Sequence, residues 1–141
     1  MKIHQHLVLL LLLAGSAQAQ SGEICPVLPS GTGLEWKYLQ GPDFDVCYAL
    51  DAQSKQEVFG LYLGYHPSFH PSHEHRAERG YVGKHKVTWY KQGTEGASSA
   101  YARETSIPIG EHGYQAHVWI NASTPQELKQ RRALLQQIRF Q

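Results

Sequence analysis

Apolar and polar residues alternate in several short segments, and this two-residue period most constrains how the chain can fold. A β-strand places successive side chains on opposite faces, so such segments are typical of strands that bury one face. The segment 58–65 is apolar on both faces and predicts a central strand, whereas 101–107 is polar on one side and predicts a strand near an edge. The predicted strands are 34–38, 44–48, 58–65, 86–90, 101–107 and 114–120.

One helix is indicated after the last of these strands. Thr124-Pro125-Gln126-Glu127 has the form of a capping box, with proline at the first helical position. Apolar residues then recur at helical spacing, at Leu128, Leu134, Leu135 and Ile138. The predicted fold class is therefore α+β, an antiparallel sheet of about five to seven strands with a C-terminal amphipathic helix packed on one face.

Residues 1–19 have the features of a secretory signal peptide. Lys2 precedes the apolar run 7–13, and the small residues Ala17 and Ala19 form a cleavage site. The run is too short to span a bilayer. Ser16 stands where a lipoprotein signal would carry its lipidated cysteine, so we expect no lipid anchor. The expected organisation is a signal over 1–19 and a single α+β domain over 20–141, secreted or periplasmic and soluble after cleavage.

Cys25 and Cys47 are the two cysteines of the chain. In an exported protein such a pair predicts one structural disulfide. A metal pair or a reactive thiol is the alternative, but neither cysteine stands in a C-x-x-C spacing.

The charge balance disfavours partners that bind through a strong overall field. Lys and Arg number 13 and Asp and Glu number 12, and losing Lys2 with the signal makes these equal. A neutral chain gives no overall field for nucleic acid or anionic lipid. We expect no nucleic-acid partner, no membrane span and no lipid anchor. The local cluster Lys129, Arg131 and Arg132 is interpreted as the solvated face of the helix.

The C-terminal layout resembles that of PsbP-like exported α+β domains. The residues that carry this resemblance are Ala116-His117-Val118-Trp119-Ile120, Thr124-Pro125-Gln126-Glu127-Leu128 and Ile138-Arg139-Phe140. The chain also resembles periplasmic accessory proteins of exosortase systems, in Leu61-Tyr62-Leu63-Gly64-Tyr65 and Trp89-Tyr90. The Cys-Leu-Pro-Gly-type segment of those proteins should follow the first of these strands, whereas Cys25-Pro26-Val27-Leu28-Pro29 precedes it. The first resemblance implies an exported α+β domain, and the second implies a periplasmic accessory protein.

Histidines are concentrated between His66 and His75, together with Glu74. Imidazole nitrogens suit zinc or copper, and the candidate metal ligands are His70, His73 and His75, which His85, His112 and His117 could join. Pro67 and Pro71 exclude a regular helix across this segment. We therefore expect a solvated loop that binds zinc or copper weakly at most, and no other cofactor.

Catalytic signatures are absent from the sequence. It contains no Gly-x-Ser-x-Gly and no His-Glu-x-x-His, and Glu74 has no neighbour that supplies an oxyanion hole. Aromatic residues on the strands are expected in the core, but several on one open face would bind sugar, peptide or lipid. Asn121-Ala122-Ser123 is a formal glycosylation sequon, relevant in a eukaryotic host.

The predicted function is a non-enzymatic binding or accessory protein, whose partner is a protein or a small ligand. The alternatives are a periplasmic transition-metal-binding protein that uses the His66–His75 loop, and a hydrolase with an unrecognised site.

Overall fold

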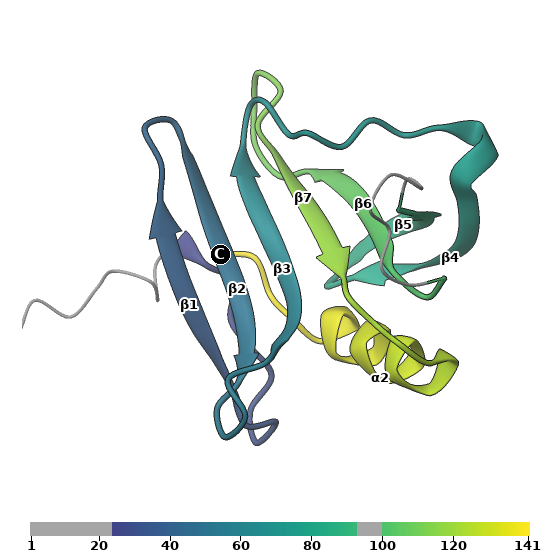
Figure 1. Ribbon diagram of the computed structural model, residues 1–141. Coiled ribbons are helices and arrows are strands. Elements are labelled where there is room, and N and C mark those ends of the chain that lie inside the picture. Colours follow the sequence, from purple (N-terminus) through teal and green to yellow (C-terminus); the bar gives the residue numbers. More distant parts are fainter. Residues whose placement is uncertain (1–23, 93–99) are drawn as a thin grey trace, which may run out of the picture.

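A computed structural model describes residues 24–92 and 100–141, so the predicted signal over 1–19 lies outside the described residues. Its centre is one antiparallel sheet of seven strands in the order β1-β2-β3-β7-β6-β5-β4 (Figure 1). One α-helix, α2 (Pro125–Gln136), follows the last strand of this described part. The strands are β1 (Leu34–Gln40), β2 (Phe44–Asp51), β3 (Glu57–Gly64), β4 (Arg76–Val82), β5 (His85–Lys91), β6 (Arg103–Pro108) and β7 (Gln115–Ile120).

Two antiparallel meanders build the sheet. The first is β1-β2-β3, and the second runs from β4 at the far edge back to β7, which pairs with β3. A long connection containing the short 3-10 helix η1 (His73–His75) therefore leads from β3 to the opposite edge of the sheet (Figure 1). This topology places the histidine-rich segment in the connection that links the two meanders in sequence, rather than in a hairpin turn.

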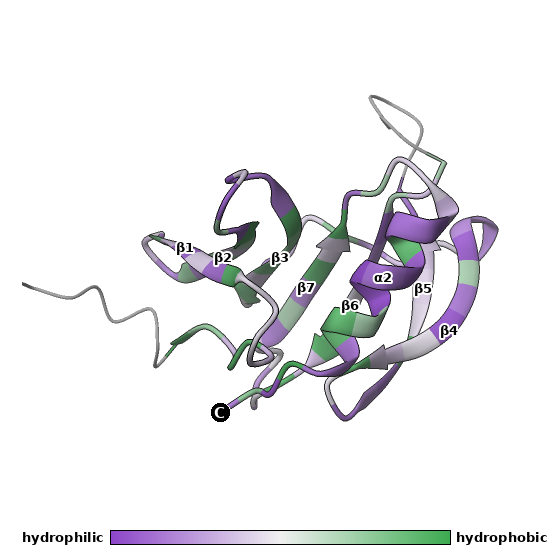
Figure 2. Ribbon diagram, turned by 90° about the horizontal axis from the view of Figure 1, so that it is seen from below, coloured by the Kyte–Doolittle hydropathy of each residue, from purple (hydrophilic) through white to green (hydrophobic). Residues whose placement is uncertain are grey.

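The helix covers the second meander on one face of the sheet (Figure 2). Thr124 caps it by accepting a hydrogen bond from Glu127 N at 3.1 Å, which confirms the predicted capping residue. Leu128 and Leu135 join the core with strand residues such as Val118. The helix ends at Gln136, but Ile138 beyond it is still only 1% exposed. The apolar stripe predicted for the helix therefore continues beyond the last helical residue.

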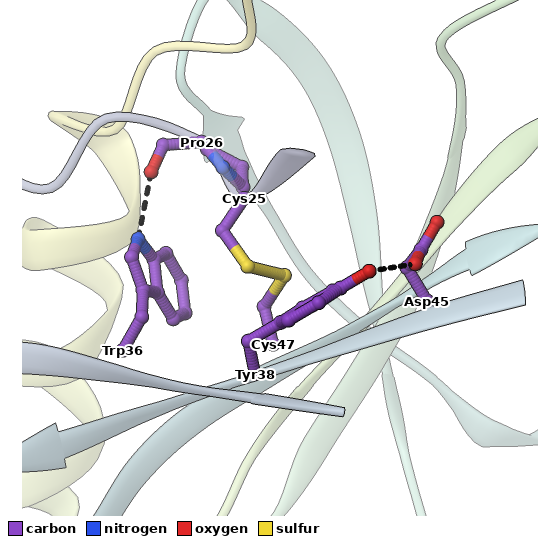
Figure 3. Close-up of a disulfide and its surroundings, with 6 residues drawn as sticks. All are labelled: Cys25, Pro26, Trp36, Tyr38, Asp45 and Cys47. Carbon is purple, nitrogen blue, oxygen red and sulfur yellow. Dashed lines mark hydrogen bonds between the residues drawn. A yellow bond between two sulfur atoms is a disulfide. The ribbon is translucent and has the colours of Figure 1, made fainter. Parts of the chain in front are cut away.

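The N-terminal segment covers the first meander on the same face. Cys25 is joined to Cys47 of β2 with their Cα atoms 5.9 Å apart, as the sequence predicts (Figure 3). Trp36 Nε1 donates to Pro26 O at 2.8 Å, so this hydrogen bond also attaches the N-terminal segment to β1. A β-bridge between Val27 and Arg139 ties this segment to the end of the chain.

A tyrosine and an aspartate interact beside the disulfide. Tyr38 Oη donates to Asp45 Oδ1 at 2.5 Å (Figure 3). This hydrogen bond, reinforced by desolvation and by the negative charge of Asp45, raises the pKa of Tyr38 to about 12. Asp51, at the end of β2, has its pKa lowered because the backbone N–H groups of Ser54 and Gln53 donate to its carboxylate.

The structure corrects two strand predictions. β4 was not predicted, because its sequence Arg-Ala-Glu-Arg-Gly-Tyr-Val has no clear alternation; it is the edge strand of the second meander. β6, predicted near an edge, is an interior strand between β5 and β7. Its polar residues have two separate explanations, since Glu104 and Ser106 lie on the face away from the helix while Arg103 is buried and paired with Glu78.

The central position predicted for 58–65 is confirmed, because β3 lies between β2 and β7. None of the helices in the described ranges is both long and apolar enough to cross a membrane.

Candidate functional site

The sheet has a second face, opposite the helix and the N-terminal segment. Because side chains alternate along a strand, His117 and Trp119 of β7 lie on the face opposite Ala116 and Val118, which belong to the core. We call this second face the open face. The β3–β4 connection crosses part of it, and Phe69 of that connection packs onto His117.

A row of rings runs over the open face from β2 to β5. Neighbouring ring centroids in this aromatic row are 6.0, 5.5, 5.3 and 5.5 Å apart, within the range of favourable aromatic contacts. The row consists, in order, of Tyr48, Trp119, His117, Phe69 and Tyr90. Tyr48, Trp119 and Tyr90 are half-buried, so each of these residues is still partly accessible to solvent.

Trp119, which lies between Tyr48 and His117 in the row, is held in place by a hydrogen bond and by packing over β3. Its Nε1 donates to Glu57 Oε1 at 2.6 Å. Its ring lies directly over Gly60 of β3, where an added Cβ would come 2.2 Å from Trp119 Cζ2. A side chain at position 60 would therefore collide with this indole, so the strand needs a glycine here.

Phe69 fastens the histidine-rich connection to the sheet. Only 6% of it is exposed, and its ring is nearly parallel to that of His117, at 18°. Beside it, an open groove of about 590 Å³ separates the connection from β6 and β7. The residues that line this groove include Tyr65, His66, His70, Ser106 and Gln115. The aromatic row and the groove are contiguous at Phe69 and together form the candidate site.

A histidine and a carboxylate meet below Phe69. His117 is 8% exposed, and its Nε2 lies 3.5 Å from Glu104 Oε2. That nitrogen has no hydrogen-bond partner within the described residues. Ser106 pairs with His117 across the strands, so the residue types of an acyl-transfer site are present. In the part of the chain that the structure describes, however, no hydrogen bond joins Ser106 to His117, so the contact between nucleophile and base is missing.

The predicted metal ligands are dispersed. His70 lines the groove beside Phe69, whereas His73 and His75 lie on η1. His85 contacts Phe140 near the chain end, and His112 is in the β6–β7 turn. Across residues 24–92 and 100–141, no three His, Cys, Asp or Glu side chains gather in a group that could hold a metal ion. Weak zinc or copper binding by this segment stays a prediction.

Comparisons with known proteins identify no relative, since no family model, curated protein or solved structure matches the chain.

Sequence reasoning identified the residue types of this site but not their grouping. The alternation in 114–120 does place His117 and Trp119 on one face. Their contacts with Tyr48 and Phe69 depend on the pairing of β7 with β3 and on the path of the connection. Neither of these can be read from local periodicity. Trp36 and Trp89, by contrast, face the core side, as predicted for most of the aromatics.

Proposed function

We propose that this protein is an exported, non-enzymatic binding domain whose ligand lies against the open face, over the aromatic row and the adjoining groove. The observation that carries the proposal is the aromatic row, because it places half-buried rings side by side on the face opposite the helix. Rings that only fill a core have no reason to form such a row on the outer face. The Cys25–Cys47 disulfide supports export to an oxidising compartment.

The ligand class that fits this surface best is a saccharide. A sugar ring has C–H faces that pack on flat aromatic surfaces and hydroxyls that donate to carboxylates. Trp119 and Tyr48 supply the rings. Glu57 and Glu104 supply carboxylates beside them. Each carboxylate can accept more hydrogen bonds than the protein donates to it. A purely apolar ligand would leave these carboxylates desolvated without partners.

The resemblance to periplasmic accessory proteins of exosortase systems also implies an accessory role, and the resemblance to PsbP-like domains implies export.

The test is calorimetric titration of the mature chain with two neutral oligosaccharide probes, an N-acetylglucosamine tetramer and cellotetraose. We expect at least one of them to bind. Tyr48→Leu should weaken that binding on the order of tenfold, because stacking on one ring typically contributes about 1 kcal/mol or more. Tyr81→Leu is the matched control, since Tyr81 is an exposed tyrosine on the edge strand β4, outside the row.

Two results would reject the saccharide surface. The first is that neither probe binds. The second is that the Tyr48 and Tyr81 variants weaken binding equally. Incubation of each probe with the wild-type chain separates the binding proposal from the hydrolase alternative, because a binding domain should leave the bound probe uncleaved.

A further inference from the structure

Charged residues are segregated between the two meanders although the mature chain is neutral overall. On the strands β1, β2 and β3, carboxylates outnumber the single cation Lys37. On β4, β5 and α2 the balance reverses: the carboxylates of these described elements are Glu78 and Glu127, among a larger number of Lys and Arg. A net charge near zero therefore conceals a basic region around the edge strand and the helix.

A groove runs through this basic region between β4 and α2. It encloses about 450 Å³, and its charged lining residues are Arg79, Lys129 and Arg132, all of them cations. Gly80 and Gln136 also line it. We call this the basic groove. It lies between the edge strand β4 and the helix, and none of its lining residues belongs to the aromatic row.

Glu78, the carboxylate beside the basic groove, is already paired with arginine side chains. Glu78 Oε1 accepts from Arg103 Nε at 2.9 Å, and Arg132 Nη1 is 3.7 Å from the same oxygen. Within the described residues, no carboxylate forms an ion pair with Arg79 or Lys129. Glu78 thus interacts with Arg103 and Arg132, while Arg79 and Lys129 form no ion pair among the described residues, and an excess of positive charge remains at the groove.

Hydrogen-bond donors are also in surplus around this groove. Arg132 Nη2 donates to Arg79 O at 2.8 Å, but Arg132 Nε has no acceptor among the residues described. The same holds for Nε1 of Trp89, a fully buried side chain that lies against Gly80. Buried donors normally find acceptors, so these two leave the base of the groove short of acceptors.

We propose that the basic groove binds a phosphate group. A phosphate supplies several acceptor oxygens and negative charge, the complement of two guanidinium groups and one ammonium group. Arg132 provides a planar, partly ordered donor group, whereas Lys129 and Arg79 contribute exposed charge from the helix and from the edge strand. Two sources carry this chemistry outside the cytoplasm: free inorganic phosphate and the headgroup of an anionic phospholipid.

The experiment uses the mature chain and measures two kinds of binding at fixed ionic strength. Thermal unfolding is followed with sodium phosphate against sodium chloride, and co-sedimentation is followed with phosphatidylcholine vesicles that contain or lack phosphatidylglycerol. We expect binding in at least one arm. Phosphate stabilisation identifies the free anion as a sufficient ligand, and binding only to phosphatidylglycerol vesicles identifies the lipid headgroup.

Matched charge variants locate the site. The double variant Arg79→Gln and Lys129→Gln removes exposed groove cations and should weaken binding on the order of tenfold or more. Lys37→Gln, which removes an exposed cation on β1, should leave it unchanged. No binding in either arm, or equal weakening by the Lys37 variant, would overturn the proposal. Because the groove and the aromatic row lie on different surfaces, either proposal can fail without the other.

Discussion

Replacing Gly60 by alanine should displace Trp119, which packs over this glycine in the candidate site. The new methyl group would lie 2.2 Å from Cζ2 of the Trp119 ring, so the indole must move. Overpacking of this kind typically costs about 1–3 kcal/mol. If the indole swings away, its 2.6 Å hydrogen bond to Glu57 is also lost, which adds about 1.5 kcal/mol or more because the acceptor is charged. We therefore expect Gly60→Ala to lower the free energy of unfolding by about 2.5–4.5 kcal/mol.

Guanidinium unfolding of Gly60→Ala in two backgrounds isolates the cause. In a Trp119→Leu background the collision is removed, and alanine should be neutral or should stabilise by up to about 1 kcal/mol by restricting the unfolded chain. The difference between the two backgrounds measures the coupling of the glycine to the indole. Equal destabilisation in both backgrounds, or no destabilisation in the wild type, would refute the packing of Trp119 over Gly60.

Three other predictions address the disulfide, a tyrosine and the histidines. Serine at both Cys25 and Cys47 should lower the free energy of unfolding by about 3 kcal/mol, measured by denaturant unfolding under non-reducing conditions; a change within error would contradict a stabilising disulfide. Absorbance titration at alkaline pH should show one tyrosine ionising near pH 12, absent in Tyr38→Phe. Because its pKa is raised in the folded chain, its contribution to stability is present below the unfolded pKa of about 10 and is lost as the pH rises to 12; a step near pH 12 that persists in Tyr38→Phe would show that Tyr38 is not the group responsible. A chelator should leave the melting temperature unchanged, and so should alanine at His70, His73 and His75; a large drop on chelation would instead restore the metal-binding hypothesis.

Local sequence patterns predicted the elements that bury one clear face. The first two strands, the central strand, the last strand and the capped helix all rest on apolar patterning or capping chemistry that acts over a few residues. β4 escaped prediction because an edge strand with one partner tolerates charged residues and a glycine. β6 was misplaced because its polar residues indicate the open face and a buried ion pair rather than an edge.

The candidate site could be predicted only in part, because it is assembled by long-range pairing. Trp119 and Glu57 are distant in the sequence and meet because β7 pairs with β3. Phe69 reaches His117 because the chain must cross from β3 to the far edge of the sheet. The basic groove follows the same logic, since Arg79 and Arg132 become neighbours only when α2 packs beside β4. Composition alone indicated neutrality and could not reveal this cluster.

The three tryptophan indoles provide the most direct test of the proposed ligand surface. Trp119 belongs to the aromatic row, whereas Trp36 donates to Pro26 on the core side and Trp89 is fully buried there. Their indole N–H signals can be followed by NMR while the mature chain is titrated with the oligosaccharide probe. A saccharide on the open face should shift the Trp119 signal saturably and leave the other two nearly unchanged. A probe that binds while the Trp119 signal stays fixed, or that moves all three signals equally, would contradict it.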